Sequence, residues 1–303
     1  MKKFFYKIVL FIILFCVILN MFVYGTNKSL KKLYGPTTGQ QIQQSFKDVL
    51  RKKYNCIILG NSRMYRGVNP SILIHDTYNF SHDNDSFNQE YYKLVYLKEN
   101  NNLPNIIVLG VDYFQFSFLA DTRNYIYSRY FSKGYTKDFN KPLKKEVSDI
   151  FKVYQNQFKG RVESLFKESK KNVPYLKENG QYIYYGVASK NDKIKRNSNI
   201  LKVQLNYFEK ILDLCEKENI TVFLVIPPTR NVELSSYTNK DIENIDKIFK
   251  NKQDKKVYYL NYSTNKSFNI NDYQDVTHLN IEGADKFTKI LSKDINKIIN
   301  LKK

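Results

Sequence analysis

The feature that most constrains the fold of this chain is a set of five short apolar runs, rich in β-branched and aromatic residues. They span residues 56–59, 77–80, 106–109, 221–226 and 257–260. Other segments repeat their apolar side chains at helical spacing, namely residues 86–100, 201–219 and 282–303. Strands that are apolar on both faces and alternate with amphipathic helices are typical of a parallel sheet covered on both sides. The pattern therefore predicts an α/β domain with three layers.

A membrane segment precedes this domain. Residues 8–24 carry no charge, follow a basic start, and approach the roughly 20 residues that cross a hydrocarbon core. No small-x-small cleavage motif follows them, so we expect a retained signal anchor, and a cleaved signal peptide is the alternative. Lysines flank the segment on both sides and do not fix its orientation. We expect the bulk of the chain to be extracytoplasmic, because signal-like N-termini usually send the following residues across the membrane.

These two features define the expected domain organisation. We expect an anchor or signal segment at 1–27, a stalk with a short helix at 28–53, and the α/β domain at 54–303. Residues 113–200 are rich in Tyr, Phe and Lys and show no clear strand period, so we interpret them as an insertion of helices and loops. Their aromatic side chains are expected to pack together, and a sugar-stacking surface is the alternative.

The charge of the chain limits its partners. The formal charge is +20, from 49 Lys and Arg against 29 Asp and Glu. The lysines are spread along the chain and no binding motif appears, so nucleic acid is a poor candidate. Anionic lipid headgroups or an anionic cell-wall polymer fit the charge better, and a composition bias without any partner remains open. The three cysteines suggest neither a disulfide framework nor a metal site, and we expect no metal and no organic cofactor.

A turn after the first apolar run presents a lone hydroxyl. The Gly-Asn-Ser-Arg sequence places Ser62 where a strand should end and a helix begin. A serine becomes a nucleophile when a histidine oriented by a carboxylate takes its proton. His278 has Asp275 three residues before it and a helical segment after it. Both positions fall at the carboxyl edge of a parallel sheet, where such folds build their sites. These are candidate catalytic residues, against the alternatives of a structural turn and a capping Asp-x-x-His.

The same residues carry a resemblance to a known family. The sequences "ILGNSR" and "DVTHLNIEGADKF" resemble the first and last signature blocks of the SGNH, or GDSL-type, hydrolase superfamily. The resemblance covers residues 54–112 and 200–300. It implies a flavodoxin-like fold and acyl-ester chemistry, with Ser62 as nucleophile, His278 as general base and Asp275 as the residue that orients the base.

The two middle blocks depart from the family pattern, and they concern the oxyanion hole. Where the family often has a glycine donor, the chain reads "YNFSHDNDS", so the N–H of Ser81 would have to serve. Where the family often has an asparagine, the chain reads "LGVDYF", with Asp112 in its place. A carboxylate there would repel an oxyanion unless it is protonated or points away. The remaining donor would be the N–H of Ser62 itself.

In plan the chain resembles the membrane-anchored branch that acts on cell-surface polymers, such as the teichoic acid D-alanine transfer protein and the alginate O-acetylation proteins. Arg63 and Arg66 then either contact an anionic acceptor or pair with carboxylates. The resemblance implies O-acyl transfer to a cell-surface glycan, with acyl groups supplied by a multi-spanning membrane partner. An extracellular esterase or deacetylase with the same triad and a non-catalytic glycan-binding scaffold are the alternatives.

Two further histidines have weaker interpretations. We expect His82 to be an exposed loop histidine without catalytic duty, although it is near enough to the site to be a second base or a substrate contact. We expect His75 to be structural.

Overall fold

The computed structural model of the chain describes residues 2–120, 123–139, 155, 158–163, 165–166 and 172–301. The chain divides into two compact units. One comprises Met1–Thr37 and Lys144–Tyr175, and the other comprises Thr38–Leu143 and Leu176–Lys303. The second unit contains all strands of the main sheet.

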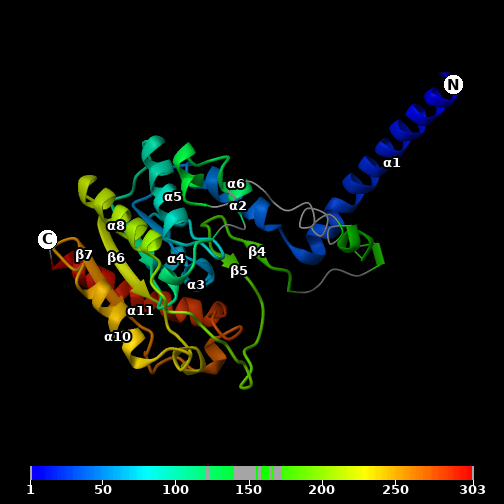
Figure 1. Cartoon of the computed structure of the whole chain (residues 1–303). Helices are drawn as coiled ribbons and strands as arrows, with labels where there is room; N and C mark the ends of the chain where they lie inside the picture. The colour runs from blue at the N-terminus through cyan, green and yellow to red at the C-terminus, as the bar shows by residue number, and fades with distance from the viewer. Residues whose placement is uncertain are drawn as a thin grey trace. The chain divides into compact units, whose positions relative to one another are not determined.

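A parallel sheet of five strands forms the centre of the second unit (Figure 1). Its strands are β1 (Cys56–Leu59), β2 (Thr77–Asn79), β3 (Ile106–Gly110), β6 (Thr221–Ile226) and β7 (Val257–Asn261). They are ordered β2-β1-β3-β6-β7, and every neighbouring pair is parallel. Strand β2 lies on one side of β1, and β3 and the later strands lie on the other side, as in flavodoxin-like sheets. The predicted α/β fold is confirmed, and each apolar run forms one strand.

The described helices of this unit lie between and around the strands. They are α2 (Thr38–Asp48), α3 (Ser62–Gly67), α4 (Pro70–Leu73), α5 (Phe87–Glu99), α6 (Asn124–Tyr127), α8 (Lys202–Lys217), α9 (Asn231–Leu234), α10 (Asn239–Lys250) and α11 (Ile281–Asn300). Three short 3-10 turns are η1 (Gln115–Ser117), η2 (Lys133–Asp138) and η3 (Ile270–Asp272). The segments with helical spacing in the sequence form α5, α8 and α11.

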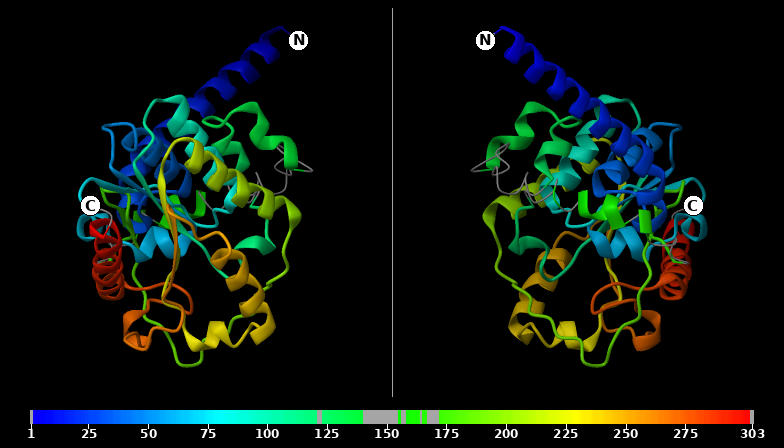
Figure 2. Two further views of the ribbon diagram at one scale, coloured as in Figure 1. Left: turned by 90° about the vertical axis from the view of Figure 1, so that its left-hand side faces the viewer. Right: turned by 90° about the vertical axis from the view of Figure 1, so that its right-hand side faces the viewer.

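Side chains of each strand alternate between two apolar cores. Ile57 and Leu224 face the core formed with α8 and α10. Their neighbours Ile58 and Val225 face the core formed with α3 and α11. Figure 2 shows α10 and α11 on opposite sides of the strands. Because helices cover both faces, most positions of the strands are apolar or aromatic, which explains why the strands were visible in the sequence.

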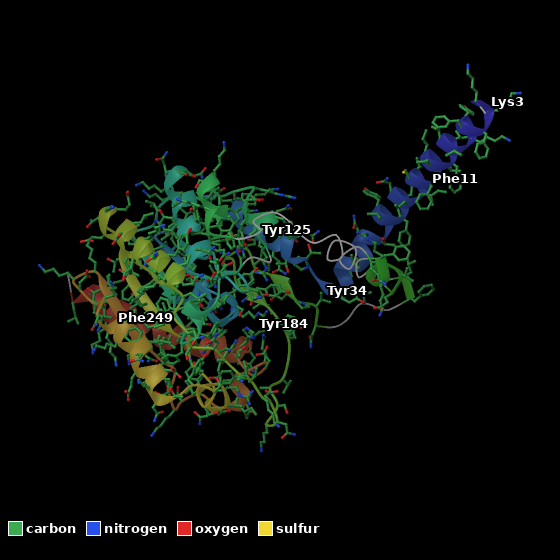
Figure 3. All side chains as sticks on the ribbon, in the orientation of Figure 1. Lys3, Phe11, Tyr34, Tyr125, Tyr184 and Phe249 are labelled. Carbon is green, nitrogen blue, oxygen red and sulfur yellow. The ribbon has the colours of Figure 1, made fainter. Side chains whose placement is uncertain are left out.

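Helix α1 (Lys2–Tyr34) belongs to the first unit. Its part Lys2–Asn27 is long and apolar enough to cross a membrane, and the most apolar 18-residue stretch of that part has no buried residue. Figure 3 shows the side chain of Phe11 projecting outward from α1, and this side chain is 68% exposed. By length and composition the helix fits a membrane span and a signal sequence equally well.

The expected insertion at 113–200 contains strands that the sequence did not indicate. A two-stranded sheet is formed by β4 (Tyr175–Leu176) and β5 (Tyr182–Ile183). Strands of two residues are too short to give an alternating pattern, which is why they were not predicted. The helices and loops expected between residues 140 and 154 lie outside the described residues.

Aromatic residues near α6 pack against each other, as expected. The rings of Tyr127 and Phe131 are stacked with their centroids 5.1 Å apart. Phe46 of α2 meets Phe131 edge to face at 5.7 Å. All three rings are buried, so this part of the segment is core and not a surface for stacking sugars.

Candidate active site

The turn between β1 and α3 places Ser62 at the carboxyl edge of the sheet. Gly60 in this turn has a φ of 147°, and a Cβ atom there would lie 2.6 Å from Cγ of Met64. A Cβ atom on Gly110, at the end of β3, would lie 2.1 Å from the same atom. The two glycines therefore let Met64 of α3 pack directly on the strand ends. The side chain of Asn61 caps α3, so Ser62 is the first residue of that helix.

The loop before α11 holds the other two candidate catalytic residues. An antiparallel bridge between Tyr273 and Leu279 closes this loop. Oδ1 of Asp275 accepts hydrogen bonds from the N–H groups of Thr277 and His278, both at 2.8 Å. The main chain of the loop thereby fixes the carboxylate in place.

A chain of hydrogen bonds joins this loop to the turn. Nε2 of His278 lies 2.7 Å from Oγ of Ser62. Nδ1 of His278 lies 2.9 and 2.8 Å from the two carboxylate oxygens of Asp275, and 3.0 Å from Oγ1 of Thr277. A ring that donates from Nδ1 to the carboxylate leaves Nε2 free to accept the serine proton. The structure thus brings together the three candidate catalytic residues of the sequence.

The surroundings of the imidazole ring favour its neutral form. Burial lowers the pKa of His278 below its ordinary value of 6.5, and the positive charge of Arg66 lowers it further, while Asp275 opposes both. Burial alone would raise the pKa of Asp275, but its hydrogen bonds with His278 and with the loop N–H groups lower it below its ordinary value. At neutral pH the site therefore contains a neutral base beside a carboxylate.

A pocket of about 390 Å³ opens at this chain of hydrogen bonds. The three candidate catalytic residues form part of its wall, and Phe114, Phe118 and Ile194 form an apolar part. Its volume lies in the range of small-molecule sites. A larger hollow of about 660 Å³ beside α8 and β7 contains none of the three candidate catalytic side chains.

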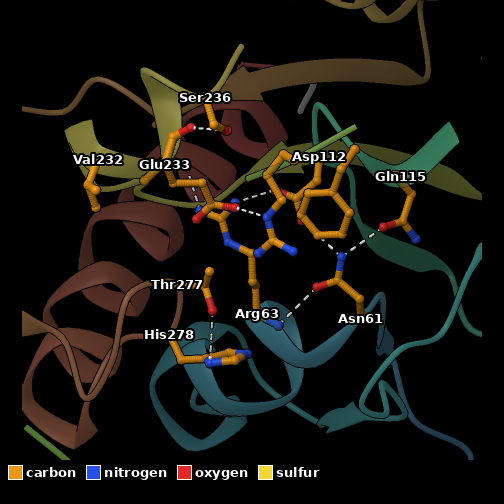
Figure 4. A network of polar contacts seen from close by, with 12 residues as sticks. Asn61, Arg63, Asp112, Gln115, Val232, Glu233, Ser236, Thr277 and His278 are labelled. Atoms are coloured by element: carbon orange, nitrogen blue, oxygen red, sulfur yellow. Dashed lines mark hydrogen bonds and ion pairs between the residues drawn. The ribbon is translucent and has the colours of Figure 1, made fainter. Parts of the chain in front are cut away.

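The guanidinium of Arg63 belongs to a buried network beside the turn (Figure 4). It pairs with the carboxylate of Asp112 and donates to the hydroxyl of Thr229 at 2.5 Å. The other oxygen of Asp112 accepts from the amide of Asn61 at 2.9 Å. The paired side chains are only 3% and 2% exposed. Asp112 therefore holds the residues on both sides of Ser62.

The charges of this pair are shifted by burial and by each other. Burial raises the pKa of Asp112 above its ordinary value, and Arg63 and Asn61 oppose that rise. Burial alone would lower the pKa of Arg63, but Asp112 and Glu233, together with nearby tyrosines, outweigh it and the pKa is raised. Ser81 is also buried, and its N–H donates to Oδ1 of Asn79 at 3.1 Å. Neither Ser81 nor Asp112 is among the residues that line the pocket.

Arg66 pairs with a carboxylate, as does Arg63. Its guanidinium lies 2.9 Å from Asp83 and 5.1 Å from the ring centre of Tyr184. Of the two interpretations of these arginines, the structure therefore shows the pairing with carboxylates.

Both expectations for the other histidines were wrong. His82 is buried, and its Nδ1 lies 2.8 Å from Nζ of Lys93 and 3.1 Å from the hydroxyl of Tyr127. These partners come from α5 and α6, so the residues next to His82 in the sequence gave no sign of its burial. The side chain of His75 is 93% exposed, and its Nδ1 lies 2.9 Å from a carboxylate oxygen of the neighbouring Asp76.

Parts of the pocket wall were not predicted from the sequence. Nε of Arg196 donates to the buried carboxylate of Glu233 at 2.8 Å, and its guanidinium lies 4.2 Å from the ring centre of Phe114. Ile194 and Arg196 lie in a stretch without secondary structure, where no periodic pattern indicates which side chains face inward. Elsewhere in the part of the chain that the structure describes, no three His, Cys, Asp or Glu side chains gather to hold a metal ion.

A family model without a functional description matches residues 151–300. No curated protein matches the chain. Among solved structures, a family two carbohydrate esterase from Clostridium thermocellum in complex with cellohexaose aligns with 9% identity and a TM-score of 0.34. This alignment covers 82% of the present chain and 65% of the esterase chain, and a TM-score this low supports no conclusion about fold or function.

Proposed function

We propose that this chain is a serine acyl-ester enzyme of the SGNH type, and that it transfers an acyl group such as acetyl to a cell-surface glycan through an acyl-enzyme. The observation that supports it most is the continuous chain from Ser62 through His278 to Asp275, with contacts of 2.7 and 2.8 Å. This geometry recurs on unrelated folds that perform acyl transfer, so the site supports the proposal independently of the fold.

Each residue has a role in this reaction. Oγ of Ser62 forms a bond to the acyl carbon while its proton passes to Nε2 of His278. His278 then gives that proton to the leaving oxygen or sulfur, whose bond to the acyl carbon breaks. In the second half, the hydroxyl of the acceptor gives its proton to His278 and bonds to the acyl carbon, and Ser62 leaves and regains a proton. Asp275 stabilises the imidazolium that forms in each half.

The proposed location and the proposed acceptor follow from the N-terminal helix and from the net charge of the chain. Helix α1 includes a segment with the length and composition of a membrane span, and the formal charge is +20. A basic domain held at a membrane attracts anionic polymers and lipid headgroups. The proposal therefore includes a retained anchor, an extracytoplasmic domain, and a multi-spanning membrane partner that supplies acyl groups.

The test uses the full chain in detergent micelles, incubated with p-nitrophenyl acetate and analysed by intact mass. We expect a transient gain of one acetyl group on the wild-type chain and none on Ser62→Ala. Ser71→Ala is the matched control, because Ser71 is exposed and outside the pocket, and it should gain the label as the wild type does.

The fate of the label separates the alternatives. Transfer to an added glycan supports the acyltransferase, whereas release to water at the same rate with and without glycan indicates an esterase or deacetylase. Absence of a label with acetyl and longer esters and with thioesters would contradict the enzyme and favour a glycan-binding scaffold.

A further inference from the structure

The proposed reaction creates a negative charge on the carbonyl oxygen, and this charge needs hydrogen-bond donors in place beforehand. Most of the polar groups near the serine turn are not available to the oxyanion. The N–H of Ser81 donates to Asn79 at 3.1 Å, and Asp112 carries no free donor. The amide of Asn61 donates to Asp112 at 2.9 Å. Of these groups, only the N–H of Ser62 is left for the oxyanion.

A different residue that carries a side-chain amide lines the same pocket. Asn84, on the loop after β2, lines the pocket together with Ser62 and His278. Its side chain is exposed, and its φ is 55°. Among the residues that the structure describes, none forms a hydrogen bond with this side chain. A neutral amide offers two N–H donors, so Asn84 supplies the kind of group that Asp112 does not.

We propose that the side-chain amide of Asn84 donates a hydrogen bond to the carbonyl oxygen of the acyl ester as it becomes an oxyanion, beside the N–H of Ser62. This inference rests on the proposed function and assigns a further catalytic residue to it. The chemical class it recognises is the carbonyl oxygen of an ester or thioester, whatever the acyl chain.

The chain before Asn84 is anchored to the serine turn. The N–H of His82 donates to the main-chain oxygen of Gly60 at 3.3 Å. The carboxylate of Asp83 pairs with Arg66 of α3 at 2.9 Å. These two contacts connect the loop with the turn at Gly60 and with α3, the helix that begins at Ser62.

The residue after Asn84 is anchored more deeply. Asp85 is buried and accepts from Nζ of Lys93 at 2.5 Å and from the hydroxyl of Tyr127 at 2.6 Å. A buried ion pair is a weak source of stability, but it fixes the position of the chain that carries it. The main chain is thus held on both sides of Asn84. This limits the positions that its amide can reach, which lowers the cost of placing a donor at the oxyanion.

The test measures the rate at which the full chain in detergent is acylated by p-nitrophenyl acetate. Asn84→Gly removes the amide and tolerates the positive φ, so we expect kcat/KM for acylation to fall roughly 100- to 1,000-fold with little change in KM. Asn84→Asp keeps the size and puts a carboxylate at the oxyanion, so its loss should be at least as large. Asn101→Gly is the matched control, because Asn101 is exposed, has a φ of 54° and is outside the pocket.

The outcomes separate this inference from the proposed function. If the wild type and both Asn84 variants acylate at the same rate, the assignment of Asn84 is overturned and the proposed function stands. If the wild type forms no acyl-enzyme with any donor, the proposed function fails and the assignment fails with it. Thermal unfolding identifies a variant that has lost its fold. If Asn84→Gly proves unstable, the Asn84→Asp variant decides, and wild-type rates in it overturn the assignment.

Discussion

Two adjacent residues of α3, Ser62 and Arg63, each belong to a network that contains an aspartate, and the two aspartates differ in their access to water. Ser62 contacts His278, whose partner Asp275 has a side chain that is 40% exposed. Arg63 contacts Asp112, whose side chain is 2% exposed. The first pair lies where solvent and substrate can reach it, and the second lies inside the protein.

The difference shows how one short turn combines chemistry with rigidity. His278 lines an open pocket, and burial lowers the pKa of its ring, which favours the neutral form that can accept a proton. The pair of Arg63 and Asp112 holds a fixed separation of charge, since an unpaired ion would be costly in that position. We infer that the buried pair of Arg63 and Asp112 positions Ser62, whereas the pair of His278 and Asp275 accepts the proton of its hydroxyl.

The largest expected effect on activity comes from Asp275→Asn. An amide at this position stabilises the imidazolium poorly and favours the wrong tautomer of His278, so kcat for acyl-enzyme turnover should fall on the order of 10⁴-fold. The midpoint of thermal unfolding should change little, because Oδ1 of an asparagine can still accept from the N–H groups of Thr277 and His278. Steady-state kinetics with p-nitrophenyl acetate and a thermal melt measure the two quantities.

The control for this variant is Asp76→Asn. Asp76 also pairs with a histidine, His75 at 2.9 Å, but it lies outside the pocket. It should keep the wild-type rate. A wild-type rate in Asp275→Asn would show that the Asp-x-x-His loop is a structural turn.

The largest expected effect on stability comes from Arg63→Met. It leaves the carboxylate of Asp112 buried without its cation, which should reduce the free energy of unfolding by about 3–5 kcal/mol. The double variant Arg63→Met with Asp112→Leu should recover most of this loss, because it removes both charges. Urea unfolding followed by circular dichroism measures the change.

The surface pair of Arg51 and Asp48 provides the comparison for Arg63→Met. The side chain of Arg51 is 59% exposed, so Arg51→Met should cost no more than about 1 kcal/mol. Equal losses in Arg51→Met and Arg63→Met would contradict the special role given to the buried pair.

The sequence predicted those parts of the fold and of the candidate site that depend on residues close together in the chain. The five strands were visible because each lies in a short run rich in apolar, β-branched or aromatic residues. Ser62 was visible because a glycine and a helix-capping residue precede it, directly after an apolar run that predicts a strand. Asp275 and His278 were visible because the carboxylate and the ring are three residues apart on one loop, and a helix with a clear period follows.

The parts that were not predicted depend on contacts between distant segments. The pair of Arg63 and Asp112 joins residues 49 positions apart, and neither residue has a periodic neighbourhood that indicates its partner. Burial of His82 depends on Lys93 and on α6, and the pocket wall at Ile194 depends on how an irregular stretch crosses the sheet edge. The types and spacing of residues along the sequence do not indicate which distant segments contact each other in the fold.

The smallest expected effect concerns the pH at which the pair of His278 and Asp275 becomes able to accept the proton of Ser62. His278 must be neutral to accept the serine proton, so acylation should increase with pH through the pKa of its ring, which lies below 6.5. Burial is the main cause of that lowering, and the charge of Arg66 adds to it, while the charge of Asp83 opposes it. Arg66→Gln removes a lowering charge, so the midpoint of the pH profile of kcat/KM should move upward.

Two further variants determine whether charge is the cause. Arg66→Lys keeps the charge and should keep the wild-type midpoint. Asp83→Asn removes an opposing charge and should move the midpoint downward. Profiles of kcat/KM for p-nitrophenyl acetate between pH 4 and 9 measure all three. If Arg66→Gln and Asp83→Asn shift the midpoint in the same direction, packing and not charge links these side chains to the ring. If neither shifts it, the base is controlled by burial and Asp275 alone, and the pair of Arg66 and Asp83 serves only to hold the loop of Asn84.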